Sequence, residues 1–168
     1  PIISGNKYRK LKYNLVAAKD QGFKKLLTFG GAFSNHIAAV AGAGKEFGFE
    51  TIGIIRGEEI KDKIQDNPSL QFAQENGMQF HFVDRTTYKN KTGATFVEEL
   101  QQLYGDFYQI PEGGTNALAI KGCEEILTET DKAYFTHVCC AMGTAGTISG
   151  IINSSNEKQQ IIGFSSLK

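Results

Sequence analysis

Two features of this chain could together hold one small phosphorylated cofactor: a lysine close to its start and a glycine-threonine loop far downstream. Lys7 lies in the run Ser-Gly-Asn-Lys-Tyr-Arg-Lys-Leu at residues 4–11, and the loop is Gly-Thr-Ala-Gly-Thr at residues 143–147. A lysine amine can form a Schiff base with an aldehyde, and backbone N–H groups at a helix start bind phosphate. Pyridoxal 5'-phosphate requires both groups, so the pairing predicts this cofactor.

The loop has the features of a cup for a single phosphate. Gly143 and Gly146 allow the backbone to approach an oxyanion closely around Ala145, and Thr144 and Thr147 add hydroxyl donors where a helix is predicted to start. The loop lacks the lysine of a Walker motif and the glycine spacing of a dinucleotide fingerprint, which disfavours nucleoside triphosphates and NAD. Taken by itself, the loop is equally typical of a tight strand-to-helix turn without a ligand.

The segment around Lys7 is predicted to be helical. Asn6 is placed to cap a helix that runs to about Ala18, with Lys7 in its first turn. A lysine at a positive helix terminus and beside other cations is expected to have a lowered pKa, which leaves more free amine to attack an aldehyde. Lys10, one turn further on, is expected to face the phosphate. From charge alone, the better explanation of this segment is a solvated basic cluster.

A second candidate turn follows the first predicted strand, in Gly-Gly-Ala-Phe-Ser-Asn-His at residues 30–36. Ser34 is placed to cap the next helix, with Asn35 and His36 in the first turn of that helix. Free N–H groups at this position attract an anion, so Ser34 is a candidate ligand of a substrate carboxylate and Asn35 of a cofactor phenolic oxygen. The alternative is a plain serine cap followed by a neutral surface histidine.

The composition favours a small-molecule ligand. Lysine plus arginine and aspartate plus glutamate are equal at 18 each, so no net field would attract nucleic acid or an anionic membrane. The three cysteines lack metal-ligand spacing and are interpreted as core thiols of a reducing cytoplasm. No apolar stretch approaches the length that crosses a bilayer.

Short apolar runs alternate with helical segments, which predicts a doubly wound α/β fold with parallel sheets, helices on both faces and ligand loops at the carboxyl ends of the strands. The second and fifth runs show little polar alternation, as expected of strands covered on both faces. The predicted strands are Leu26–Phe29, Thr51–Ile55, Gln79–Val83, Phe107–Ile110, His137–Ala141 and Gln160–Phe164. The predicted helices after the first strand are Asn35–Phe47, Pro68–Gly77, Ala94–Tyr104, Asn116–Glu129 and Gly146–Ser155.

The three motifs, in this order, resemble the 1-aminocyclopropane-1-carboxylate deaminase and D-cysteine desulfhydrase family of fold-type II pyridoxal phosphate enzymes. The resemblance covers nearly the whole chain. It implies that Lys7 is the catalytic Schiff-base lysine and that loop 143–147 holds the phosphate together with Lys10. It also implies that Ser34, Asn35 and His36 contact the substrate, with Asn35 also at the cofactor ring and Ser34 contributing to catalysis.

The resemblance implies a cytoplasmic deaminase or lyase acting on a small amino acid. D-Cysteine would undergo β-elimination to sulfide, pyruvate and ammonia, whereas 1-aminocyclopropane-1-carboxylate would be opened to 2-oxobutyrate and ammonia. Residues 15–112 would form a smaller α/β domain, and residues 1–14 and 113–168 would be part of a larger, incomplete cofactor-binding domain. The intact protein is expected to be a homodimer. The rival interpretations are a non-catalytic α/β module that binds a phosphate ligand and a purely structural fragment.

The chain departs from the family pattern in ways that bear on activity. Phe33 replaces the usual glutamine before the Ser-Asn pair, and Ile37-Ala38 replaces Thr/Val-Arg, so substrate specificity is expected to differ. Relatives continue beyond the position of Lys168 with a segment that supplies the partner of the pyridine nitrogen and a substrate tyrosine. The chain alone is therefore expected to be inactive and to expose apolar surface of the larger domain.

Overall fold

The computed structural model describes residues 3–166, which divide into two compact units. The central unit comprises Ala18–Glu112. The split unit combines Ile3–Ala17 with residues 113–166. Helix α1 (Gly5–Asp20) has most of its length in the split unit. Each unit has its own parallel β-sheet.

The central unit is built on a four-stranded sheet in the order β3-β2-β1-β4, and every neighbouring pair is parallel. In the register of the sheet, Leu27 of β1 lies opposite Ile52 of β2 and Gln109 of β4. The inner five residues of both β1 and β2 are buried, as expected of apolar strands covered on two faces. The strands are β1 (Lys25–Gly31), β2 (Glu50–Arg56), β3 (Met78–Val83) and β4 (Tyr108–Ile110).

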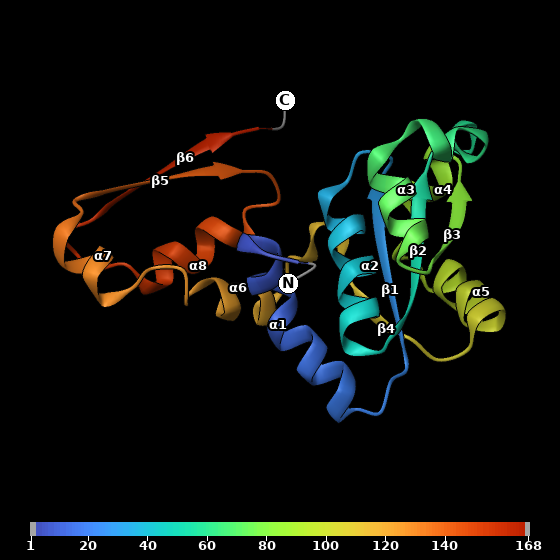
Figure 1. Ribbon diagram of the computed structural model, residues 1–168, viewed down its shortest axis with the longest axis horizontal. Helices are drawn as coiled ribbons and strands as arrows, with labels where there is room; N and C mark the ends of the chain where they lie inside the picture. Colours follow the sequence, from blue (N-terminus) through green and yellow to red (C-terminus); the bar gives the residue numbers. More distant parts are fainter. Residues whose placement is uncertain (1–2, 167–168) are drawn as a thin grey trace. The chain divides into compact units, whose positions relative to one another are not determined.

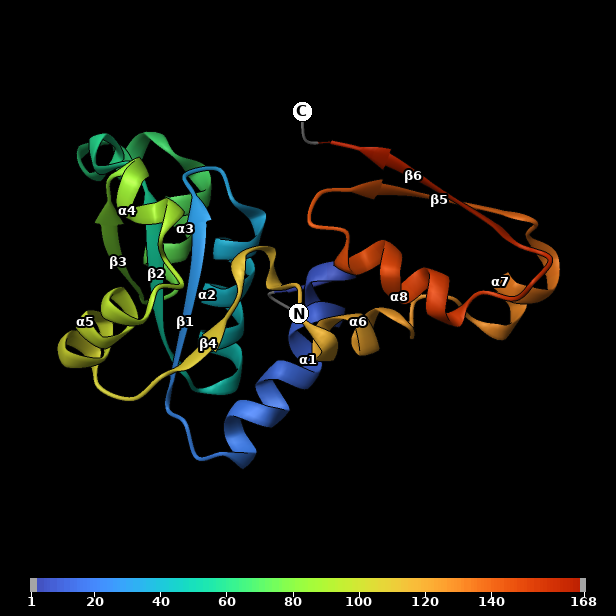
Figure 2. The same ribbon diagram turned by 180° about the vertical axis from the view of Figure 1, so that it is seen from behind.

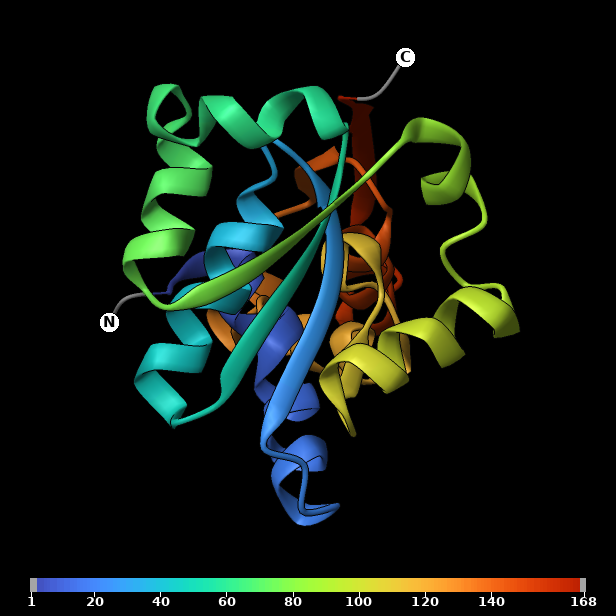
Figure 3. The ribbon, with the colours of Figure 1, turned by 90° about the vertical axis from the view of Figure 1, so that its right-hand side faces the viewer.

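Helices cover both faces of this sheet (Figure 3). Helices α2 and α3 lie on one face, and α4 and α5 lie on the other, where Tyr88 and Leu100 join a buried cluster with Leu27, Ile52 and Ile54. Asn67 caps α3 by accepting from the N–H groups of two residues in its first turn. The bounds are α2 (Asn35–Phe47), η1 (Glu58–Asp66), α3 (Pro68–Glu75), α4 (Arg85–Lys89) and α5 (Ala94–Tyr104).

The split unit contains the parallel pair β5-β6, whose crossover helix α8 packs against one side of the pair (Figures 1 and 2). Helix α6 packs on α8 at Gly150, where an added Cβ would lie 2.4 Å from the Cβ of Cys123. Gly122 similarly lies against the carbonyl oxygen of Arg9 in α1. The elements are η2 (Glu112–Gly114), α6 (Ala117–Cys123), α7 (Glu129–Tyr134), β5 (His137–Met142), α8 (Gly146–Ser154) and β6 (Gln160–Ser165).

The α/β class, the parallel sheets and all six predicted strands are confirmed, with strand ends shifted by one or two residues. The single helix predicted over Asn116–Glu129 is wrong. Helix α6 ends at Cys123, and Thr128 starts α7 with a capping box to Asp131. Helix α4 lies in a stretch where no helix was predicted.

Other expectations fail in the split unit. Strand β5 alternates between exposed and partly exposed residues, because its sheet has two strands and α8 covers one side. Cys139 is therefore exposed, and only Cys123 of the three thiols is buried, so a common role as core thiols is wrong. Helix α1 begins at Gly5, so Asn6 lies inside the helix and does not cap it. No helix within residues 3–166 is both long and apolar enough to cross a membrane.

Gly150→Ala tests the close packing of α6 on α8. The new methyl group would meet the Cβ of Cys123 at 2.4 Å and the carbonyl oxygen of Ile120 at 2.7 Å, so the helices must separate. We expect a loss of about 1–3 kcal/mol in the free energy of unfolding, measured by urea denaturation followed by circular dichroism. Ile152→Ala, on an exposed position of the same helix, is the control. Equal stability of the two variants would contradict this packing argument.

Candidate functional site

The ammonium group of Lys10 is the best-defined polar feature of the split unit. The residue is 3% exposed. Its Nζ donates to the carbonyl oxygen of Gly113 at 2.9 Å and to the hydroxyl groups of Thr115 at 3.0 Å and Thr144 at 3.2 Å. All three acceptors are neutral, so they satisfy the N–H groups but do not balance the charge. Burial, followed by the nearby charge of Lys7, lowers the pKa of Lys10 to about 8.

The backbone of loop 143–147 is shaped tightly around this ammonium. Ala145 has φ 59°, in the left-handed region, a conformation that costs a non-glycine residue on the order of 1 kcal/mol and that is common at ligand sites. A Cβ on Gly146 would lie 2.7 Å from Thr115 Oγ1 and 3.0 Å from Lys10 Cε. The two hydroxyl groups of Thr115 and Thr144 are 2.6 Å apart. Only glycine at position 146 therefore lets the loop approach so closely.

These groups fit the phosphate end of pyridoxal phosphate. Helix α8 begins at Gly146, and the N–H groups of a first helical turn lack intrahelical acceptors. The positive helix terminus and the Lys10 ammonium both favour an anion. One N–H is already used, because Gly146 donates to the carbonyl oxygen of Thr144 at 2.8 Å. A phosphate dianion would supply the counter-charge that the neutral partners of Lys10 do not.

Lys7 lies one helical turn before Lys10 on α1 and is partly buried. Burial lowers the pKa of Lys7, and the Cys123 thiol offsets part of this effect. The lowered pKa agrees in direction with the expectation from the sequence, but its largest cause is loss of solvent rather than the helix terminus. Because the charge of Lys7 lowers the pKa of Lys10, the two amines lie within electrostatic reach of each other.

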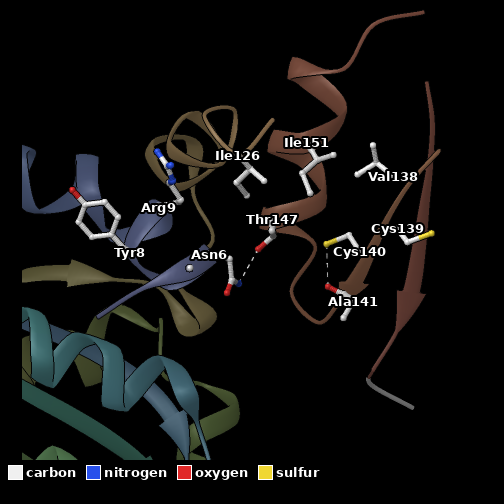
Figure 4. A pocket seen from close by; sticks show the side chains of 11 residues that line it. Asn6, Tyr8, Arg9, Ile126, Val138, Cys139, Cys140, Ala141, Thr147 and Ile151 are labelled. Carbon is white, nitrogen blue, oxygen red and sulfur yellow. Dashed lines mark hydrogen bonds between the residues drawn. The ribbon is translucent and has the colours of Figure 1, made fainter. Parts of the chain in front are cut away.

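Asn6 and Thr147 connect the start of α1 to the loop. Asn6 Nδ2 donates to Thr147 Oγ1 at 3.1 Å (Figure 4). Both side chains line a cavity of about 660 Å³ whose other walls come from α1, β5 and α8, including the apolar side chains of Val138 and Ile151. Neither of the two predicted cofactor lysines lines this cavity. The cavity therefore lies beside the phosphate loop and is not itself the phosphate cup.

The basic cluster at the start of α1 divides between two faces of the helix. Glu125 binds one face: its carboxylate accepts from Arg9 at 2.7 Å, from Lys12 at 2.8 Å and from the Tyr13 hydroxyl. The hydrogen bonds from Lys12 and Tyr13 lower the pKa of Glu125 to about 2. Lys10 lies on the other face of the helix with Asn14, which is fully buried.

Sequence reasoning missed both Glu125 and Asn14. Asn14 forms a reciprocal amide pair with Asn116, with Nδ2-to-Oδ1 distances of 3.2 and 2.7 Å. Asn116 also caps α6, so the pair fixes the turn that carries Gly113 and Thr115 against α1. The spacing of residues 7, 10 and 14 on one helical face was the available signal in the sequence.

Ser34, Asn35 and His36 belong to the central unit. Ser34 Oγ accepts from the N–H of Ile37 at 3.4 Å, which confirms its role as the cap of α2. Asn35 is exposed in the first turn of that helix. Ile37, where the family pattern has Thr or Val, is fully buried. The turn from β1 to α2 is tight, because a Cβ on Gly30 would lie 2.5 Å from Ile37 Cγ1.

His36 is not a surface residue, which corrects the alternative of a neutral surface histidine. It is 2% exposed, and its Nε2 lies 2.8 Å from the hydroxyl of Thr28. That hydroxyl donates its only proton to the carbonyl oxygen of Ile110 at 2.9 Å. His36 Nε2 must therefore be the donor to Thr28. The ring joins α2 to β1 and β4 inside the central unit.

The chain has relatives among curated proteins. No known family profile matches the chain. A protein of Pyrococcus abyssi with the provisional name 1-aminocyclopropane-1-carboxylate deaminase is 29% identical over 171 residues, covering 96% of this chain and 51% of that protein. A bifunctional D-cysteine desulfhydrase/1-aminocyclopropane-1-carboxylate deaminase of Arabidopsis thaliana is 28% identical over 165 residues, which cover 89% of this chain and 41% of that protein. The chain is a homologue of these proteins. It spans about half the length of the curated relatives it matches.

Solved structures show the same fold in other enzymes. A solved homologue of ACC deaminase superposes with a TM-score of 0.74 at 24% identity, over 96% of the present chain and 51% of the solved chain. A pyridoxal 5'-phosphate-dependent aspartate racemase gives a TM-score of 0.72 at 15% identity, over 94% of this chain and 46% of the racemase chain. The fold is therefore that of the fold-type II pyridoxal phosphate enzymes.

The lowered pKa of Lys10 predicts a pH dependence of stability. Its folded-state pKa of about 8 lies below the ordinary value of 10.5, so between these pH values the unfolded chain binds more protons than the folded chain. The contribution of Lys10 to the free energy of unfolding therefore rises with pH from about 8, and Lys10→Met removes this rise. Urea denaturation between pH 7 and 10 in phosphate-free buffer measures it.

Lys12→Met is the control for this experiment, because the hydrogen bond to Glu125 raises the pKa of Lys12 and leaves it protonated throughout that range. Parallel stability curves for the wild type and Lys10→Met would contradict the proposed titration of Lys10.

Thr28→Val tests the buried role of His36. The substitution keeps the β-branched shape but removes the hydroxyl that accepts from His36 Nε2 and that donates to the Ile110 carbonyl. We expect the free energy of unfolding to fall by about 1–3 kcal/mol in urea denaturation. Thr51→Val, at another buried threonine of the same sheet, is the matched control. A solvent-facing His36 would make the two variants equally stable.

Proposed function

We propose that this chain is the cofactor-binding part of a pyridoxal phosphate-dependent deaminase or desulfhydrase that acts on a small amino acid. The observation that carries the proposal is the Lys10 ammonium, 3% exposed and held only by neutral oxygens beside the loop of Thr144. Burying a charged group of this kind lowers the stability of the folded chain unless an anion lies beside it. The names of the curated homologues support deaminase and desulfhydrase chemistry.

In this proposal the phosphate is bound by the loop of residues 143–147 and by Lys10. Lys10 supplies the charge, the N–H groups of the first turn of α8 point their dipoles at the anion, and the Thr144 and Thr147 hydroxyls add donors. Ala145 keeps its left-handed conformation because the turn that it forms presents these groups to one point. The phosphate thereby fixes the cofactor relative to α1, which also carries Lys7.

Lys7 is the amine proposed to hold the cofactor aldehyde. Its lowered pKa increases the fraction of neutral amine at physiological pH, and only the neutral amine attacks a carbonyl. When bound, pyridoxal phosphate supplies an electron sink for the charge that develops on the substrate carbon. A Lys7 amine that is not bound to the cofactor would be available to move a proton at the substrate carbon.

Ser34 and Asn35 are proposed to bind the substrate carboxylate and the cofactor ring, with the first turn of α2 adding N–H donors. His36, in the first turn of α2, attaches that turn to β1 through its hydrogen bond to Thr28. D-Cysteine and water would give sulfide, pyruvate and ammonia, whereas 1-aminocyclopropane-1-carboxylate and water would give 2-oxobutyrate and ammonia. The central unit would correspond to the smaller domain of the whole enzyme, and the split unit to part of the larger one.

Lys7→Ala is expected to abolish covalent attachment of the cofactor. The chain is mixed with pyridoxal phosphate, reduced with borohydride and digested, and mass spectrometry then locates the modified lysine. We expect the modification on Lys7, together with a visible absorbance band that Lys7→Ala lacks, because Lys7 is the amine proposed to bind the aldehyde. Lys12→Ala, whose amine is bound by Glu125, should keep both signals.

Binding of pyridoxine 5'-phosphate, which has the phosphate but no aldehyde, separates the two ends of the site. Lys7→Ala should retain this binding, and Lys10→Met should weaken it by roughly tenfold or more, because it removes the positive charge beside the phosphate, and a close pair of opposite charges near a protein surface contributes on the order of 1–4 kcal/mol. Modification of a lysine other than Lys7 would refute its role. Binding of pyridoxine 5'-phosphate by a chain that shows no visible absorbance band with pyridoxal phosphate would favour a non-catalytic phosphate-binding module.

A further inference from the structure

The central unit has a second polar cavity that the proposed reaction does not use. The cavity has a volume of about 460 Å³, within the range of small-molecule pockets. It lies where β2, β3 and β4 end, and ligands of open parallel α/β sheets bind at the carboxyl ends of the strands. The lining residues are Arg56, Arg85, Tyr88, Lys89, Lys91 and Glu112.

The lining carries a strong excess of positive charge. Four of its side chains are cationic and one is anionic, whereas the whole chain has 18 basic and 18 acidic residues. Arg56 and Arg85 are two of the three arginines in the sequence; Arg9 is the third. Arginine is the side chain best suited to planar, bidentate binding of phosphate oxygens. Their gathering in one cavity is therefore not a consequence of overall composition.

The single carboxylate of the cavity is already occupied. Glu112 accepts from the Tyr88 hydroxyl at 2.8 Å and pairs with Lys91 at 3.1 Å. The buried Tyr88 ring also lies under two cations, with Lys91 Nζ 4.4 Å and Arg56 Cζ 5.7 Å from its centroid. Glu112 and Tyr88 thus hold Lys91 in place, and Tyr88 holds the Arg56 guanidinium over its ring without using its N–H groups. Part of the entropy cost of ordering these cations is therefore met before a ligand binds.

The remaining cations are available to a ligand. Arg85 pairs with Glu59 at 3.2 Å, but both side chains are largely exposed, and such a pair contributes little. Within residues 3–166, neither Arg56 nor Lys89 forms an ion pair. Arg56 also covers the end of β1, because its Nη2 lies 3.6 Å from where a Cβ of Gly31 would be.

We propose that this cavity binds a small phosphorylated metabolite, at a second anion site separate from the Lys10 phosphate cup. Arg56, Arg85 and Lys89 would bind the phosphate group, and Lys91 and Tyr88 would line the cavity beside it. The guanidinium of Arg56 lies over the start of the turn that leads to Ser34. An anion held by Arg56 would therefore lie close to the turn that carries the proposed substrate-binding residues.

The three arginine side chains allow a direct test. Their Nε–H groups give three resonances in a ¹H–¹⁵N spectrum of the full chain, and inorganic phosphate is added at constant ionic strength. We expect saturable shifts of the Arg56 and Arg85 signals. These shifts should persist in Lys10→Met, which removes the cation of the phosphate cup, and the Arg9 signal should stay in place in that variant because Glu125 binds it.

Charge-removing variants complete the test. Arg56→Gln and Lys89→Gln should each weaken phosphate binding at the cavity by roughly tenfold or more. Lys61→Gln, an exposed lysine of the same unit outside the cavity, should leave it unchanged. Shifts that grow linearly without saturation, that chloride reproduces, or that survive both Arg56→Gln and Lys89→Gln would overturn the proposal.

Discussion

A single positive charge held away from water by neutral oxygens is the constraint around which the split unit is organised. Lys10 is 3% exposed, and its three hydrogen-bond acceptors are a carbonyl and two hydroxyl oxygens. Keeping the ammonium there requires α1, the Gly113–Thr115 turn and the start of α8 to meet at one point. The close approaches at Gly122, Gly146 and Gly150, where a side chain would collide with a neighbour, are what allow these three segments to do so.

The same constraint explains why the loop tolerates unfavourable local geometry. An alanine in the left-handed region and an N–H that turns back to Thr144 are poor choices for a simple connection between a strand and a helix. They become reasonable if the turn is selected for the direction of its donors rather than for its own stability. Glu125, on the opposite face of α1, holds Arg9 and Lys12 away, so that the cations nearest the loop are those proposed to bind the cofactor.

Local sequence signals predicted most elements because they act over short distances. The apolar runs of β1 and β2 are buried on both faces, and the Ser34 cap and the glycines of loop 143–147 have fixed local roles. Features that depend on partners far away in the sequence were not predictable in this way. His36 is buried where its ring contacts Thr28, whose hydroxyl in turn donates to Ile110. Glu125 binds cations of α1, and β5 is half-exposed because, within the described residues, its sheet has one other strand. Arg56 and Lys89 come together only once the sheet has formed.

The division of the chain also has a consequence for how it is made. Residues 18–112 form a continuous segment with a sheet of its own, whereas the split unit needs its first fifteen described residues and everything from Gly113 onward. On a ribosome, α1 emerges ahead of the central unit but must wait for partners about a hundred positions later, such as Asn116 and Thr144. The helix that carries Lys7 and Lys10 therefore remains without its packing surface until those partners have been made, and the central unit can acquire structure before the split unit does.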